Sequence, residues 1–126
     1  FKQINDRHGH LVGDQVLRQF AQTLQRMLRS TDLVARYGGE EFLVVLSHSN
    51  EAAANRVLQR ILDEVSRLPM AIVDGQQLFV TFSAGVASMD GGDTRFSDAR
   101  SLLQAADDAL YGAKRQGRNR VSLHRP

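Results

Sequence analysis

Cysteine is absent from this sequence, and so are long apolar runs and any N-terminal signal-peptide pattern. Without cysteine, disulfide bonds and thiolate metal sites are excluded, which fits a reducing compartment. No apolar run is long enough to span a bilayer as a helix. We therefore expect a cytoplasmic domain, whose parent protein could be tethered to a membrane through another domain.

Aromatic residues and net charge are also scarce, at 6% of the sequence and a formal +2. A nucleic-acid-binding domain usually has a broad basic face with exposed aromatic side chains. The basic residues instead concentrate near the C-terminus, at Lys114, Arg115, Arg118, Arg120 and Arg125. This pattern favours a compact anion, such as a nucleotide phosphate, and argues against a nucleic-acid partner.

The 126 residues, of which 42% are hydrophobic and 24% charged, predict one soluble globular domain with its own core. The first residue is Phe1 rather than methionine, so we read the chain as a fragment of a longer protein. The polar opening at 1–13 predicts a short helical turn or loop. From there, apolar spacing predicts a helix from Asp14, as N-cap or first-turn acid, to Leu28.

Two further helices and five strands follow from the same reasoning. The helices begin at Ser49 or Asn50 and at Ser97 or Asp98, and they end before Pro69 and Gly117. Strands are predicted at 33–37, 42–46, 70–73, 78–86 and 120–123. This order of elements indicates an α+β domain with a mixed, mostly antiparallel sheet.

The most informative segment runs from Arg36 to Phe42 and holds two glycines followed by two glutamates between two predicted strands. The glycines predict a hairpin turn with positive φ angles, and their missing side chains allow a ligand to approach the backbone. Adjacent carboxylates repel each other unless a cation or polar ligand lies between them. Taken alone, the segment fits a solvated acidic hairpin equally well.

Taken together, the chain closely resembles the GGDEF domain of diguanylate cyclases over its whole length. The matching blocks lie at 1–6, 9–14, 38–42, 83–86, 106–114 and 117–119, in the family's order. The signature reads Gly-Gly-Glu-Glu-Phe, a permitted form in active members. The resemblance implies a palm-like sheet flanked by helices, related to nucleotidyl cyclases, and the condensation of two GTP into cyclic di-GMP with release of two pyrophosphates.

The resemblance also implies catalytic roles for residues of the signature. Glu40 matches the position that binds metal and acts as base toward the attacking ribose hydroxyl. Glu41 either supports the Mg²⁺ (or Mn²⁺) site or forms a salt bridge with a neighbouring cation. Lys2 matches a lysine near the phosphates, where it would offset charge that develops in the transition state.

Substrate-binding positions are carried over in the same way. Asn5 and Asp14 match the residues that read the guanine edge, although Asp14 also fits a helix cap. His10 matches a substrate contact, or it is a loop histidine bonded to backbone. The remaining matches are Gly38 and Gly39 at the turn and the phosphate-binding cations Lys114 and Arg118, which also fit ordinary helix C-terminal cations.

Arg29 and Asp32 form a separate Arg-x-x-Asp pattern just before the signature. It matches the inhibitory site at which product dimers bind in many family members, and Arg60 matches a secondary contact there. The alternative is an arginine at a helix end paired locally with an aspartate at a strand start. If the inhibitory site is present, the enzyme is inhibited by its product.

The resemblance further implies partners outside the chain. The family has a strand before Phe1 with a second metal-binding aspartate, so we expect this partial domain to be weak or inactive by itself. One domain holds one GTP, and the product requires two, so a two-fold homodimer is expected. An N-terminal regulatory domain usually controls that dimer. The rival reading is an inactive GGDEF module that binds GTP or cyclic di-GMP as a receptor.

Overall fold

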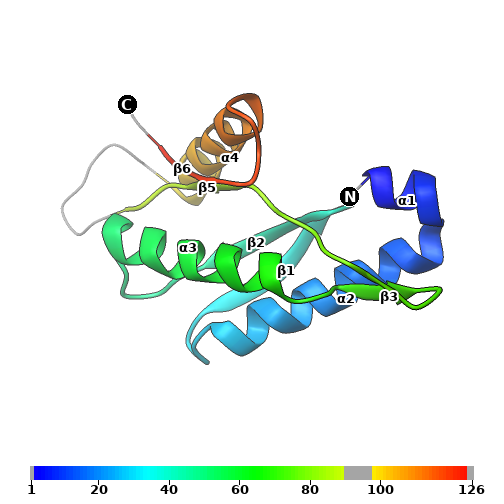
Figure 1. Ribbon diagram of the computed structural model, residues 1–126. Helices are drawn as coiled ribbons and strands as arrows, with labels where there is room; N and C mark the ends of the chain where they lie inside the picture. Colours follow the sequence, from blue (N-terminus) through cyan, green and yellow to red (C-terminus); the bar gives the residue numbers. More distant parts are fainter. Residues whose placement is uncertain (1, 90–97, 125–126) are drawn as a thin grey trace. The chain divides into compact units, whose positions relative to one another are not determined.

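Helices and short strands alternate along the chain (Figure 1). The computed structural model describes residues 2–89 and 98–124, with side chains from residue 4 onward. The chain forms two compact units, one made of residues 1–47 and 63–80 and the other of residues 48–62 and 81–126. In the described ranges, no helix is both long and apolar enough to cross a membrane.

The first unit begins with two helices, α1 (Lys2–His8) and α2 (His10–Met27), which contact each other. The chain turns between them at Gly9, whose φ of 90° is accessible to glycine at little cost (Figure 1). Asp14 is therefore neither the N-cap nor in the first turn, because α2 begins at His10. The predicted short helical turn corresponds to α1, and the helix predicted from Asp14 begins earlier, with Gly13 buried within α2 despite the low helix propensity of glycine.

A hairpin of β1 (Leu33–Gly38) and β2 (Glu41–Val45) follows α2. The strands are antiparallel, and the register shifts between Arg36 and Gly38. On the helix side, the rings of Phe20 and Phe42 lie 5.3 Å apart and are tilted by 58°. This contact joins the hairpin to α2.

A second hairpin completes the first unit, with β3 (Ala71–Val73) and β4 (Gln76–Leu78) joined at Asp74 and Gly75, a residue pair typical of hairpin turns. The prediction of one long strand over 78–86 is wrong, because β4 ends at Leu78 and β5 begins at Ala84. The two segments pair with different partners and belong to different units. A run of strand-forming residues does not show where the chain changes from one partner strand to another.

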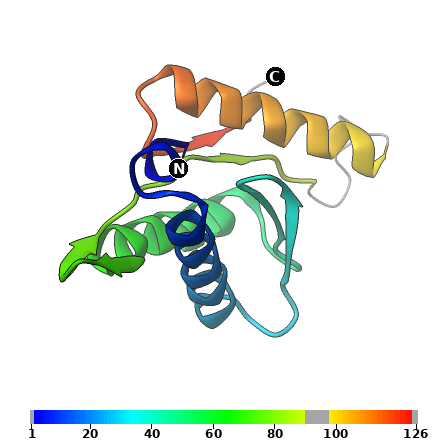
Figure 2. The ribbon, with the colours of Figure 1, turned by 90° about the vertical axis from the view of Figure 1, so that its right-hand side faces the viewer.

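The second unit contains β5 (Ala84–Val86), α4 (Ala99–Arg115) and β6 (Val121–Leu123). β5 and β6 are parallel, and α4 packs against both (Figure 2). The buried residues of α4 are small, namely Ala105, Ala109 and Ala113. A Cβ on Gly85 would collide with the backbone at Ala106 and Leu110.

Helix α3 (Glu51–Arg67) continues from the second unit into the first. The predicted caps are confirmed at two helices: the Asn50 side chain accepts from the Ala53 N–H at 2.8 Å, and Asp98 accepts from the Ser101 N–H at 2.8 Å. Ser97, the alternative to Asp98, lies outside the described residues. The composition of 89–93, rich in glycine and aspartate, predicts a loop, and residues 90–93 also lie outside the described residues.

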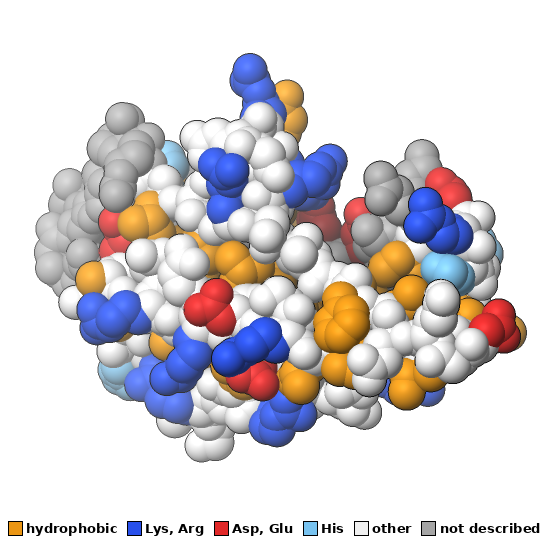
Figure 3. All heavy atoms as spheres, viewed as in Figure 1, with side chains coloured by type: hydrophobic (Ala, Val, Ile, Leu, Met, Phe, Trp, Pro, Cys, Tyr) orange, Lys and Arg blue, Asp and Glu red, His pale blue; other side chains and the backbone are white. Residues whose placement is uncertain are grey.

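The α+β class is confirmed, with two antiparallel strand pairs and one parallel pair in the described ranges. Buried apolar side chains come from helices and strands of both units, including Val16, Leu24, Ile61, Val65, Met70 and Val86. On the face drawn in Figure 3, Lys and Arg side chains lie interspersed with acidic, apolar and other polar ones.

Gly85→Ala should destabilise the protein by at least about 3 kcal/mol, because its methyl group meets backbone atoms that no side-chain rotation can move. Gly112→Ala is the matched control, since a Cβ there meets no described atom within 4 Å. It removes a glycine from a helix interior and should stabilise the protein by about 0.5–1 kcal/mol. Urea unfolding measures both, and equal midpoints for Gly85→Ala and wild type would contradict the close approach of β5 to α4.

Candidate functional site

The tip of the β1–β2 hairpin consists of Gly39 and Glu40, because Gly38 pairs with Glu41 at the end of the ladder. The predicted positive φ angles are wrong, since neither Gly38 nor Gly39 is among the positive-φ residues. A Cβ placed on either glycine would meet no described atom within 4 Å. Neither backbone conformation nor packing against the described chain therefore requires these two glycines.

Arg36 holds this tip through its side chain. Its Nε donates to the carbonyl oxygen of Gly39 at 2.9 Å, and its Nη2 donates to the same oxygen. Tyr37 is the extra residue of a bulge between Arg36 and Gly38. No role was predicted for Arg36 from the sequence. The only sequence feature that could have indicated this contact is an arginine three residues before a turn glycine.

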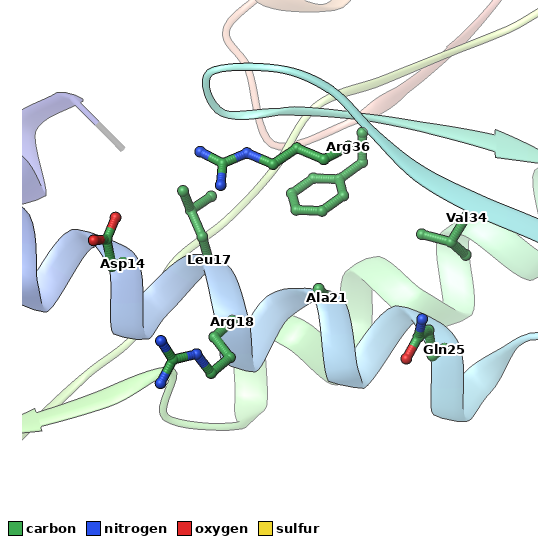
Figure 4. A pocket seen from close by; sticks show the side chains of 8 residues that line it. Asp14, Leu17, Arg18, Ala21, Gln25, Val34 and Arg36 are labelled. Carbon is green, nitrogen blue, oxygen red and sulfur yellow. The ribbon is translucent and has the colours of Figure 1, made fainter.

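An open pocket of about 440 Å³ lies between α2 and the hairpin (Figure 4). Apolar side chains share it with the predicted guanine reader Asp14, which offers hydrogen-bond acceptors, and with Arg36, whose guanidinium binds the Gly39 carbonyl. Its lining consists of Asp14, Leu17, Arg18, Ala21, Gln25, Val34, Arg36 and Phe42.

The other predicted guanine reader, Asn5, does not line this pocket and lies on α1. It is half-buried, and its backbone carbonyl accepts from the Gly9 N–H at 2.9 Å. His10 is exposed and begins α2. Lys2 begins α1, and its side chain lies outside the described part of the chain.

Glu40 at the tip and Glu41 directly after it are the two carboxylates of this segment. Glu40 is exposed in the loop, whereas Glu41 is half-buried at the start of β2. Over the described residues, no three His, Asp or Glu side chains gather into a metal-binding group. Two carboxylates fit Mg²⁺ or Mn²⁺ that is also held by nucleotide phosphate oxygens and water.

Arg29 and Asp32 form a tight ion pair after the end of α2. Arg29 Nη2 lies 3.1 Å from Asp32 Oδ1, and the Arg29 backbone N–H donates to Oδ2 at 2.9 Å. Ser47 closes the arrangement, because its carbonyl accepts from Arg29 Nη2 at 2.7 Å and its N–H donates to Asp32 at 3.3 Å. The Asp32 side chain is only 3% exposed, whereas that of Arg29 is 58% exposed.

These contacts determine the acidity of Asp32. The hydrogen bond from the Arg29 side chain has the largest influence and lowers the pKa of the Asp32 carboxyl group. Burial opposes it, while the backbone N–H groups of Arg29 and Ser47 lower the pKa further. Asp32 is thus held as a carboxylate.

A second open pocket, of about 290 Å³, adjoins this ion pair. The exposed guanidinium of Arg29 borders this pocket, which has space for a ligand. Its lining consists of Gln25, Leu28, Arg29, Ser30, Asp32, Leu33 and Val34. Arg60, the predicted secondary contact, lies on α3 in the second unit.

The predicted phosphate-binding cations Lys114 and Arg118 both lie in the second unit, at the end of α4 and just after it. Gly117, Arg118 and Asn119 all have positive φ angles, of 123°, 63° and 51°. Such a run of left-handed residues is costly for side chains other than glycine. The Asn119 N–H donates to Ser83 Oγ at 3.2 Å and helps to hold this loop.

Asp32→Asn should lower the unfolding temperature by a few degrees at pH 7. The pKa of Asp32 is lower in the folded than in the unfolded protein, so its ionisation stabilises the fold above about pH 4. That contribution is lost as the pH falls through the folded-state pKa, and the difference from wild type should shrink there. Thermal unfolding between pH 7 and pH 2 tests this, with Asp63→Asn, an exposed carboxylate, as the control. A difference that stays constant with pH would contradict it.

Comparison with known proteins confirms the resemblance drawn from the motif blocks. The model of the diguanylate cyclase GGDEF domain matches residues 1–120. Diguanylate cyclase DosC of Escherichia coli K12 is 42% identical over 123 residues, which cover 98% of this chain and 26% of DosC. The chain thus spans about a quarter of that relative's length.

Two solved structures show the same fold. The GGDEF domain of YfiN (TpbB) from Pseudomonas aeruginosa has a TM-score of 0.90 at 37% identity, over 100% of this chain and 76% of that one. The GGDEF domain of DgcB from Caulobacter crescentus, solved in complex with c-di-GMP, has a TM-score of 0.86 at 35% identity, over 98% and 71%. The chain therefore belongs to the GGDEF family of diguanylate cyclase domains.

Proposed function

We propose that this domain condenses two GTP molecules into cyclic di-GMP and releases two pyrophosphates. The observation that carries the proposal is the open hairpin tip. Neither backbone conformation nor packing against the described residues requires Gly38 and Gly39 to be glycine, and the exposed Glu40 follows them directly. A phosphate group can approach such a backbone closely. Membership of the family and the likeness to DosC support this function.

The pocket beside the tip is the proposed site of the guanine base. The Asp14 carboxylate accepts hydrogen bonds from guanine N1–H and the N2 amino group, and adenine does not offer these donors at its edge. The apolar walls formed by Leu17 and Phe42 suit the faces of a flat base. Asn5 and His10, from α1 and the start of α2, are proposed as further contacts to the nucleotide.

Glu40 is proposed as the base that takes the proton of the attacking ribose 3′-hydroxyl. Glu40 and Glu41 would together hold Mg²⁺ or Mn²⁺, and a divalent cation at this point offsets the charge of the triphosphate. Lys2, Lys114 and Arg118 are proposed to neutralise charge on the phosphates.

The Arg29–Asp32 pair is proposed as an inhibitory site for the product. Arg29 offers donors to a phosphate or to the Hoogsteen edge of guanine, and the ionised Asp32 offers an acceptor for guanine N1–H. The adjoining pocket provides space for the ligand. The c-di-GMP complex of DgcB supports product binding in the family, and Arg60 is proposed as a secondary contact.

The active species is proposed to be a homodimer in which two GTP-loaded sites face each other, because the product joins two nucleotides. We further propose the palm-like fold that the resemblance to the family implies. Regulation by an additional domain of the parent protein is part of the same proposal.

Glu40→Gln should lower the turnover number by at least about 100-fold, because an amide cannot accept the proton. The assay incubates the 126-residue chain, and a form extended at its N-terminus, with GTP and Mg²⁺ and detects cyclic di-GMP by mass. Glu64→Gln is the control, since its carboxylate pairs with Arg67 at 3.3 Å in α3. It should turn over like wild type.

Two outcomes of this assay count against the proposal. Unchanged turnover of Glu40→Gln would remove Glu40 from the catalytic step. Absence of product from both wild-type forms, with cyclic di-GMP still bound tightly, would instead make the domain a receptor without catalytic activity.

Arg29→Ala should weaken inhibition by added cyclic di-GMP at least about 10-fold, since the guanidinium is the exposed donor of the proposed inhibitory site. Initial rates at increasing cyclic di-GMP concentration measure the inhibition constant. Arg56→Ala is the control for net charge, because it removes one positive charge from α3, away from the Arg29–Asp32 pair in the sequence. Equal inhibition of the Arg29→Ala and wild-type enzymes would exclude the site.

A further inference from the structure

We infer that Arg36 is a positioning residue, which fixes the hairpin tip so that Glu40 projects in one direction. The inference rests on the proposed function for its catalytic consequence, but not for its structural content. It starts from the two hydrogen bonds that the Arg36 guanidinium donates to the Gly39 carbonyl oxygen, directly before Glu40.

The tip needs such support because its backbone provides little. Two-residue hairpin loops match the twist of their strands best when their turn residues take positive φ angles, and Gly39 and Glu40 do not. Two consecutive glycines increase the conformational freedom of this segment. Gly38, Gly39 and Glu40 are also exposed, so burial does not restrain them.

The bulge at Tyr37 allows the Arg36 side chain to reach the Gly39 carbonyl oxygen. One extra residue between Arg36 and Gly38 shifts the register, so the strand bends before the tip. The guanidinium spans this bend and binds the carbonyl of the residue three positions ahead. Figure 4 shows the Arg36 side chain extending from the hairpin above Leu17 of α2.

Arg36 is itself anchored to the helix. It pairs across the ladder with Phe42, and the Phe42 ring packs on Phe20 of α2 at 5.3 Å. The tip carbonyl, Arg36 and the helix are therefore linked through two strands and one ring contact. A lysine at this position would not reproduce the two hydrogen bonds to the Gly39 carbonyl, because its ammonium group lacks the planar, preorganised fork of the guanidinium.

The test compares Arg36→Ala and Arg36→Lys with Arg26→Ala, which removes an exposed cation of the same unit from the last turn of α2. The first measurement is NMR relaxation of the backbone amides. In Arg36→Ala, the order parameters of Gly39 and Glu40 should fall below about 0.6, while those of residues 33–36 and 42–45 stay near 0.85. Arg36→Lys should give intermediate values, and Arg26→Ala should match wild type.

The second measurement is turnover of GTP to cyclic di-GMP. Arg36→Ala should lower kcat about 10- to 100-fold with little change in KM, because a displaced catalytic group slows the chemical step without weakening substrate binding. In a Glu40→Gln background, Arg36→Ala should cause no further loss, since Arg36 acts through Glu40.

Three results would overturn the inference: an unchanged tip in Arg36→Ala, loss of order along the whole hairpin, or a higher KM with an unchanged kcat. The last would make Arg36 a direct substrate contact. If neither the 126-residue wild type nor its N-terminally extended form makes cyclic di-GMP, the proposed function fails, while the NMR measurement still decides whether Arg36 fixes the tip.

Discussion

The packing of Phe42 against Phe20 is the contact on which the first unit depends. A two-stranded hairpin is marginally stable on its own, so β1 and β2 need an apolar surface to pack against. An aromatic pair contributes about 0.5–1.5 kcal/mol beyond the area it buries. By joining the hairpin to α2, the pair also creates the pocket between them, with Asp14 on the helix and Arg36 on the strand.

The two candidate sites of this unit differ in how far the chain has already organised them. Asp32 is nearly inaccessible and is held by Arg29 and Ser47, so an acceptor stays ionised beside an exposed guanidinium. The hairpin tip is open, and its glycines leave space that no described side chain fills. An open tip suits the proposed reaction, in which a second nucleotide must enter, whereas a preformed ion pair lowers the ordering cost of the proposed product binding.

Errors in the sequence analysis occurred where tertiary packing outweighs local preference. Residues 1–13 were expected to hold only a short helical turn or loop, but they contain α1 and the first turn of α2, with the chain turning at Gly9 and Gly13 buried in α2. The run over 78–86 looked like one strand because every residue in it suits a strand, but β4 and β5 have different partners. Glycines 38 and 39 predicted positive φ angles, but neither residue adopts one, and a bulge at Tyr37 precedes the turn.

The family, the class of fold and most helix ends could be predicted from the residues alone, because ordered motif blocks, apolar spacing and caps such as Asn50 and Asp98 are local in the chain. The sequence also placed Arg29 and Asp32 close enough to pair. Only the tertiary structure decided that Ser47 completes that pair, that Gly85 must lack a side chain, and that Arg36 binds the tip carbonyl. These contacts depend on where distant segments meet and how a strand bends, and such geometry is not contained in the pattern of residues along the chain.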